Sequence, residues 1–76
     1  MYHTVEFVQR VLADVAIPGQ SRLEQVNIKK GTRLRAEIRA YVAESDKGPI
    51  EMADLFLEDG SAARAVNFSA FRFLDV

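Results

Sequence analysis

The chain has 76 residues, of which 49% are hydrophobic and 28% charged, so it can form one folded domain over residues 1–76 but not two. Ten basic and eleven acidic side chains give a formal net charge of −1, without the basic excess typical of nucleic-acid-binding domains. There is no cysteine and no apolar run of membrane-spanning length, so disulfides, thiolate metal sites and membrane insertion are excluded. We therefore expect one cytoplasmic domain.

Residues 3–19 carry the apolar spacing of a helix. Val5, Val8, Leu12 and Val15 recur at intervals of three and four residues. A Pro-Gly pair ends the segment, as is typical just beyond a helix. This pattern predicts an amphipathic helix whose broad apolar face needs a sheet to cover it.

The next segment predicts a hairpin with strands over residues 23–29 and 32–43. A three-residue loop ending in a left-handed Gly31 keeps Val26, Ile28 and Leu34 on one face, toward the helix. In the second strand, apolar side chains occupy the even positions from Leu34 to Val42. The odd positions hold Arg33, Arg35, Glu37, Arg39 and Tyr41. Because successive strand residues face opposite sides, the arginines should point away from the helix.

After a turn over residues 44–49, a second hairpin is predicted around Glu58-Asp59-Gly60. A three-residue loop there pairs Ile50 with Phe68, Met52 with Val66, Asp54 with Arg64 and Phe56 with Ala62. Asp54 would then lie on the helix-covered side. Either it lies at the periphery of the sheet beside Arg64, or a bulge at Ala53-Asp54 turns Leu55 and Leu57 inward.

The last strand should reach about residue 68, and residues 69–76 fit either further strand or one helical turn capped by Ser69. The predicted fold class is thus α+β. One N-terminal amphipathic helix packs on a four-stranded antiparallel meander sheet.

No catalytic or metal-binding constellation is visible. His3 is the single histidine, the serines fall in predicted turns, and Glu58-Asp59 occupy a hairpin tip. We therefore predict a protein that is not an enzyme and has no metal or cofactor.

Two binding surfaces share the predicted outer face of the sheet. The protein-binding candidate consists of Ala53, Leu55, Leu57, Ala63 and Ala65, with Arg33, Arg35 and Arg39 at its border. Because a small domain without disulfides gains stability from association, we expect a homo-oligomer, with a dimer favoured, or docking to a larger protein. If the leucines instead belong to the core, this patch does not exist.

The alternative is an RNA- or DNA-binding accessory protein that uses the arginine face. Its candidate residues are Lys29, Lys30, Arg33, Arg35, Arg39 and Tyr41. Glu37 interrupts this basic stripe, and the balanced charge of the chain makes nucleic acid the less favoured partner.

Overall fold

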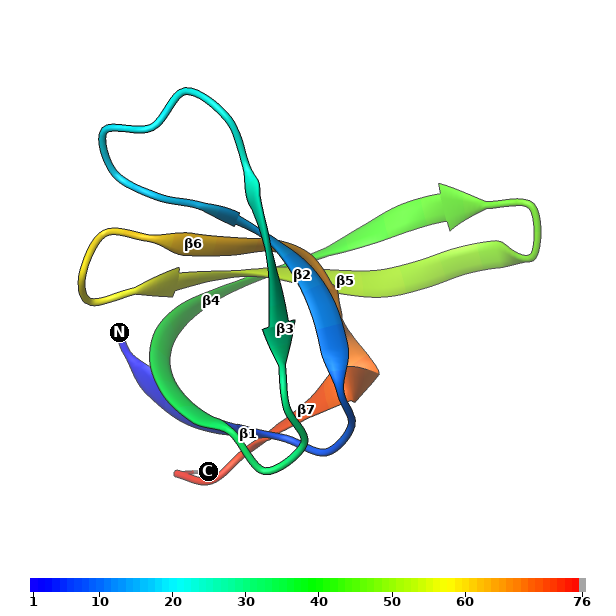
Figure 1. The fold of residues 1–76 in the computed structure, drawn as a ribbon. Helices are drawn as coiled ribbons and strands as arrows, with labels where there is room; N and C mark the ends of the chain where they lie inside the picture. Colours follow the sequence, from blue (N-terminus) through cyan, green and yellow to red (C-terminus); the bar gives the residue numbers. More distant parts are fainter. Residues whose placement is uncertain (76) are drawn as a thin grey trace.

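The computed structural model describes residues 1–75 and shows a single curled antiparallel sheet, open on one side like half of a barrel (Figure 1). Its strands are β1 (His3–Phe7), β2 (Val11–Ala16), β3 (Glu24–Ile28), β4 (Arg33–Ser45), β5 (Gly48–Leu57), β6 (Ala62–Asn67) and β7 (Phe71–Phe73). They lie in the order β3-β2-β6-β5-β4-β1-β7. Within residues 1–75, the helical part is one three-residue 3-10 turn, η1 (Phe68–Ala70), and no helix is long and apolar enough to cross a membrane.

The predicted N-terminal helix is wrong, and with it the α+β class. The segment forms β1 and β2, in which the odd-numbered Val5, Phe7 and Ala13 are buried on the concave side. Leu12, which the helical pattern placed in the core, is 66% exposed on the outer side. The segment is rich in valine, whose branched side chain loses freedom in a helix and packs well on a pleated sheet. Apolar residues on both faces of these two strands happen to recur at intervals of three and four, which is why the sequence pattern resembled that of a helix.

The predicted turn at Gly31 is confirmed, but the pairing of its flanking strands is wrong. Gly31 has a φ of +89°, and the Thr32 amide donates to the Lys29 carbonyl at 3.1 Å. Beyond the turn the strands separate, because β3 pairs with β2 whereas β4 pairs with β1 and β5. The end of β1 lies beside the turn and bonds to it: the Phe7 amide donates to the Thr32 carbonyl, and the Gly31 amide donates to the Phe7 carbonyl.

The second hairpin is confirmed up to a bulge. Its loop spans residues 58–60, Phe56 pairs with Ala62, and the Leu57 amide donates to the Ser61 carbonyl at 2.8 Å. Further along, Met52 pairs with Asn67 and not, as predicted, with Val66. The registers differ by one residue because β6 contains one residue more than β5 between the two pairs.

A bulge lies opposite Asp54, but it is in β6, and Leu55 is turned inward by the pairing of β5 with β4 and not, as the bulge alternative had it, by a bulge at Ala53-Asp54. Ala65 adopts a left-handed φ of +55°, and its amide donates to the Asp54 carboxylate at 2.8 Å. The other carboxylate oxygen lies 3.2 Å from Nε of Arg64. Asp54, 9% exposed, is therefore paired on the outer side of the sheet, while Leu55 is fully buried.

The core occupies the concave side of the sheet. Its largest fully buried side chains are Phe7, Leu55, Val5 and Val66. Four phenylalanines, Phe7, Phe68, Phe71 and Phe73, pack at one end with ring centroids 5.4–6.2 Å apart. In the C-terminal segment the strand alternative is confirmed over Phe71–Phe73, which forms β7, and the helical turn capped by Ser69 is wrong. The short turn η1 precedes it and is capped by Asn67. Residue 76 lies outside the described residues.

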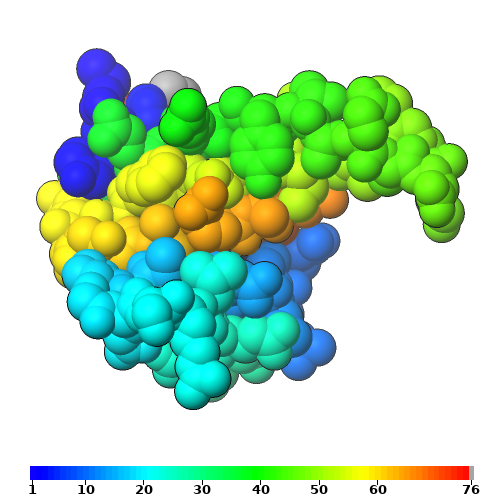
Figure 2. Space-filling model, turned by 90° about the horizontal axis from the view of Figure 1, so that it is seen from above, coloured from blue at the N-terminus to red at the C-terminus, as the bar shows by residue number. Residues whose placement is uncertain are grey.

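Strands β4 and β5 continue beyond the rest of the sheet as an arm, residues 41–51 (Figures 1 and 2). Its residues pair across the two strands, from Val42 with Glu51 to Ser45 with Gly48. No other described strand pairs with it, since β6 reaches only Met52 and β1 only Ala36. The side chain of Val42 is 60% exposed, so the arm is held mainly by its own backbone hydrogen bonds.

Candidate functional site

The alternation predicted for β4 is confirmed over residues 33–39, where Arg33, Arg35 and Arg39 are exposed and Ala36 is fully buried. Beyond residue 39 it is wrong, because Ala40 and Val42, which it placed on the covered face, are exposed. These arginines have acidic neighbours. Nε of Arg33 lies 3.1 Å from the Glu6 carboxylate, and Nε of Arg35 lies 3.7 Å from that of Glu58. The outer face is thus a surface of mixed charge and not a continuous basic stripe.

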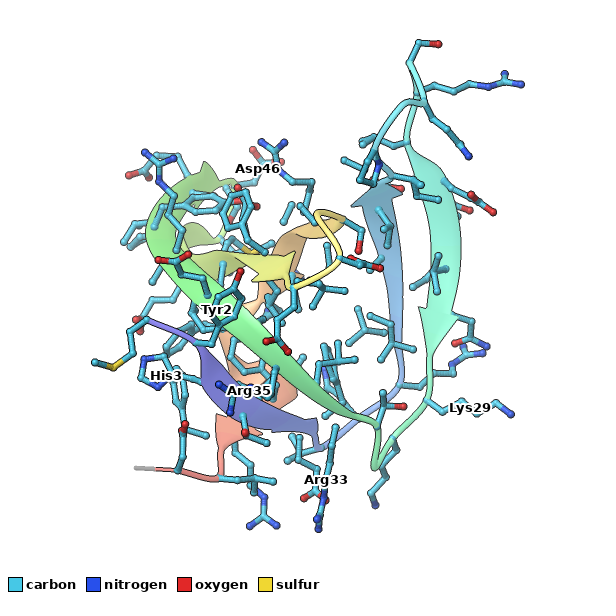
Figure 3. The ribbon with its side chains drawn as sticks, turned by 90° about the vertical axis from the view of Figure 1, so that its left-hand side faces the viewer. Tyr2, His3, Lys29, Arg33, Arg35 and Asp46 are labelled. Atoms are coloured by element: carbon cyan, nitrogen blue, oxygen red, sulfur yellow. The ribbon has the colours of Figure 1, made fainter. Side chains whose placement is uncertain are left out.

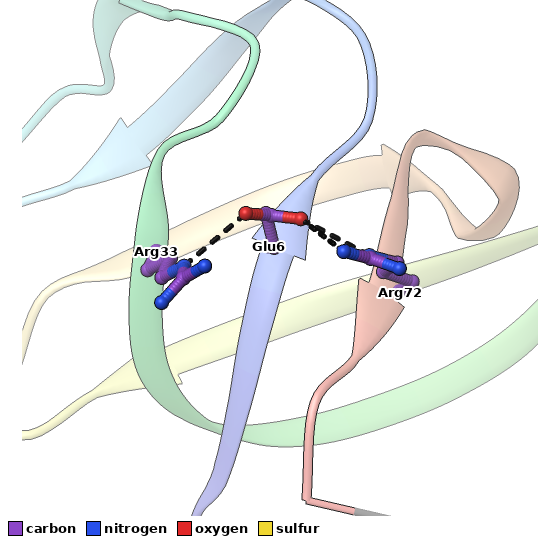
Figure 4. A network of polar contacts seen from close by, with 3 residues as sticks. All are labelled: Glu6, Arg33 and Arg72. Atoms are coloured by element: carbon purple, nitrogen blue, oxygen red, sulfur yellow. Dashed lines mark hydrogen bonds and ion pairs between the residues drawn. The ribbon is translucent and has the colours of Figure 1, made fainter.

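Glu6 binds two arginines from different strands (Figure 4). Arg72 of β7 donates to one carboxylate oxygen at 2.7 Å, and Arg33 of β4 donates to the other at 3.1 Å. The hydrogen bonds from Arg72 lower the pKa of Glu6, and the one from Arg33 lowers it further. This network links the two neighbours of β1 and occupies two of the cations on this face.

The other residues of the nucleic-acid alternative are dispersed. Arg39 pairs across the strands with Asp54, and Tyr41 lies at the base of the arm with 39% of its side chain exposed. Lys29 and Lys30 lie at the turn after β3, beyond the opposite end of β4. The structure does not bring these residues together into one site.

The predicted protein-binding patch requires a correction. Ala53, Leu55 and Ala63 are at most 2% exposed and belong to the core, so they cannot form an outer contact surface. Leu57 is partly buried on the concave side, and Ala65 is exposed at the bulge. The cause is the register between β4 and β5, which pairs Ile38 with Leu55 and so turns the odd-numbered residues of β5 inward. The sequence-based register placed the even-numbered residues of β5 inward and its odd-numbered residues outward.

The concave side holds a groove of about 360 Å³ between β3 and the start of β4. It is lined by Val15, Val26, Asn27, Ile28, Lys29, Thr32, Leu34, Leu57 and Ala63. Most of these side chains are apolar, and Lys29 supplies the single charge. Figure 3 looks toward this opening, with Lys29 on the β3 side and Arg35 on the β4 side. A binding partner here would meet an apolar floor and a basic rim.

The groove adjoins an open edge of the sheet. Among the strands of residues 1–75, β3 has a neighbour on one side only, β2, and its residues 24–27 are exposed. An edge strand presents unpaired backbone N–H and C=O groups to any extended chain that approaches it. The other edge is β7, which has three residues. β3 is therefore the longer place at which a further strand can be added.

The polar clusters of the chain have structural roles. Asp59 accepts hydrogen bonds from the amide and hydroxyl of Ser61, which lower the pKa of its carboxyl and close the hairpin loop. His3 packs against Phe73 and lies 3.5 Å from the Asp75 carboxylate. Over the described part of the chain, no three histidines or carboxylates gather as metal ligands. Neither cluster lines the groove.

Sequence reasoning recognised Val26 and Ile28 as inward-facing strand residues but assigned a helix as their cover. The signal that could have corrected this prediction is the valine-rich composition of residues 3–19, because valine favours strands. Without an N-terminal helix, nothing in the predicted fold would have covered the inward-facing side of β3. No protein-family model, curated protein or solved structure matches this chain.

Proposed function

We propose that the protein is a non-enzymatic protein-interaction module that binds an extended segment of a protein chain along β3. The observation that carries the proposal is the apolar groove lying directly beside the open edge of the sheet. In this mode of recognition, backbone hydrogen bonds along the edge supply affinity, and pockets for alternate side chains supply specificity.

The dimensions of the groove suit such a segment. Its volume of about 360 Å³ falls within the range of about 300–1,000 Å³ that is common for binding pockets. Each valine- or leucine-sized side chain that becomes fully buried there would contribute roughly 1.5–3 kcal/mol. Every second residue of an added strand faces the same side, so a short segment can place two such side chains over the groove.

The rim favours a segment that carries acidic residues. Lys29 lines the groove and Lys30 follows it in the chain, and both side chains are exposed. A carboxylate at the end of the bound segment would lie near these cations. The proposed ligand is therefore an extended segment with alternating apolar residues and a flanking acidic residue.

Selection from a random heptapeptide library on the immobilised protein tests this proposal. We expect enrichment of sequences with apolar residues at alternate positions, and micromolar binding of the synthetic peptides. Val26→Lys places a charge at the groove and should weaken that binding at least tenfold. Leu12→Lys is the matched control, because Leu12 is exposed on the outer side of the neighbouring strand.

Selection without any enrichment would contradict the proposal, as would peptides that bind Val26→Lys and the wild type equally well. Circular dichroism and urea denaturation of both variants show whether each is folded. If Val26→Lys does not fold, Val26→Thr retains the side-chain shape and adds a polar group to the groove, and binding should still fall several-fold.

A nucleic-acid-binding accessory role is the second candidate, favoured by the exposure of Arg33, Arg35 and Arg39 on one side of β4. Phosphates would have to compete with Glu6 and Glu58 for two of these side chains. Fluorescence anisotropy with labelled single-stranded RNA should then show binding that falls steeply between 50 and 200 mM salt. Absence of binding at the lower salt concentration would exclude this role.

A further inference from the structure

We propose that the extended segment that pairs with β3 is β3 of a second copy of this chain, so that two sheets join edge to edge in a symmetric dimer. This inference rests on the proposed function, since it names the partner of the same groove and edge. Its evidence is the exposed edge of β3, the charges at the two ends of that edge and the apolar residues between them.

A twofold axis between two copies of β3 makes them antiparallel, as all the other strand pairs of the sheet are. Directly opposed residues of antiparallel strands point to the same face. The two sheets therefore form one continuous sheet, with both concave sides on the same face, only if each inward-facing residue lies opposite an inward-facing residue of the second copy. The axis must therefore pass through a single residue position, and the central candidates are Gln25, Val26 and Asn27.

Charge distinguishes these registers. An axis through Val26 places Arg22 opposite Lys30 of the second copy and creates two repulsive pairs. An axis through Gln25 brings neither Glu24 nor Lys30 opposite a complementary charge. Only the axis through Asn27 brings Glu24 to the position across from Lys30, in the turn just beyond the end of β3, and the symmetry makes that attractive pair twice.

The unpaired state of these charges supports the same register. In the part of the chain that the structure describes, neither Glu24 nor Lys30 takes part in an ion pair. They lie at opposite ends of the edge, one at the start of β3 and the other two residues beyond its end. Two antiparallel copies bring each into reach of its opposite charge.

Apolar packing agrees with the charges. With the axis through Asn27, Val26 of one copy lies opposite Ile28 of the other on the concave side. Val26 is 37% exposed in the single chain, and both residues line the groove. Each copy would cover the groove beside β3 of the other with apolar side chains. The net charge of −1 per chain opposes this approach only weakly.

Disulfide trapping tests the register directly, because the chain has no cysteine of its own. Opposed Cα atoms of antiparallel strands lie about 4.5 or 5.5 Å apart, within the range that a disulfide spans. Asn27→Cys should therefore form a covalent dimer under mild oxidation. Gln25→Cys is the matched control: its two copies would be separated by about 14 Å along the strands and should not cross-link.

Charge exchange provides a second, independent test in solution. Lys30→Glu and Glu24→Lys each turn both attractive pairs into repulsive ones and should weaken dimerisation about tenfold in sedimentation equilibrium. The double variant restores opposite charges and should recover the dissociation constant of the wild type. Both side chains are exposed, so neither change perturbs the core.

The outcomes separate this inference from the proposed function. Peptide binding at Val26 by a protein that stays monomeric at millimolar concentration would refute the dimer and leave the interaction module intact. Equal cross-linking of Gln25→Cys and Asn27→Cys, or a double charge variant that stays weak, would refute the register through Asn27. A cross-linked Asn27→Cys dimer with charge recovery would establish it.

Discussion

Leu55 provides the most direct test of the core, because sequence reasoning offered it as a contact residue and the structure buries it completely. Leu55→Ala should cost about 2.7–5 kcal/mol, the range for leucine side chains removed from fully buried sites. A domain of this size has a free energy of unfolding of roughly 4–11 kcal/mol, so the variant loses a large share of it. The expected fall in Tm is at least about 10 °C.

Urea denaturation followed by circular dichroism measures this change, with Val42→Ala as the control. Val42 is 60% exposed in the arm, and its truncation should cost no more than about 0.5 kcal/mol. Equal midpoints for the two variants would refute the inward orientation of Leu55, and with it the register between β4 and β5. Measurements at two protein concentrations separate this effect from any loss of association.

Three further predictions follow from turns, charges and the arm. Gly60→Ala and Gly31→Ala both force alanine into a φ of +89°, at a cost of about 1–2 kcal/mol each. Gly60→Ala should lose more stability in urea, because its new Cβ would lie 3.1 Å from Pro18 Cγ whereas nothing lies within 4 Å at Gly31; equal losses would contradict that contact. Because the pKa of Glu6 is lowered in the folded state, chiefly by Arg72, its stabilisation is present above its ordinary value of 4.5 and is lost as the pH falls through the folded pKa. Glu6→Gln should thus be less stable than the wild type at neutral pH, and this difference should disappear in urea titrations at acid pH; a difference that persists there would contradict the assignment. In hydrogen exchange, amides of the arm should exchange much faster than those at the centre of β5, and uniform protection would show that the arm is covered.

The sequence predicted local features well. The alternation over residues 33–39 of β4, the left-handed Gly31 and the loop at residues 58–60 all depend on neighbours in the chain, and all are confirmed. A bulge near Asp54 was one of two predicted alternatives, because burying an unpaired carboxylate on the covered face of the sheet would cost too much free energy.

Long-range pairing is where the prediction failed. β1 lies between β4 and β7, both distant in the chain, and β2 pairs with the distant β6 as well as with β3, the strand that follows it. Valines and a leucine on both faces of this segment satisfied helical spacing as well as strand alternation. The groove was missed for the same reason, since it exists only because a sheet without a covering helix curls around its own core.

The arm has a consequence for how the length of this chain can vary. Its residues pair only across the hairpin, so removing or adding two residues on each side of the Asp46-Lys47 tip would shorten or lengthen the ribbon and keep its alternation of hydrogen-bonded pairs. Loop tips of this kind accept inserted sequence readily. A peptide epitope or fluorophore attached there would be displayed at a distance from both the hydrophobic interior and the free edge of β3.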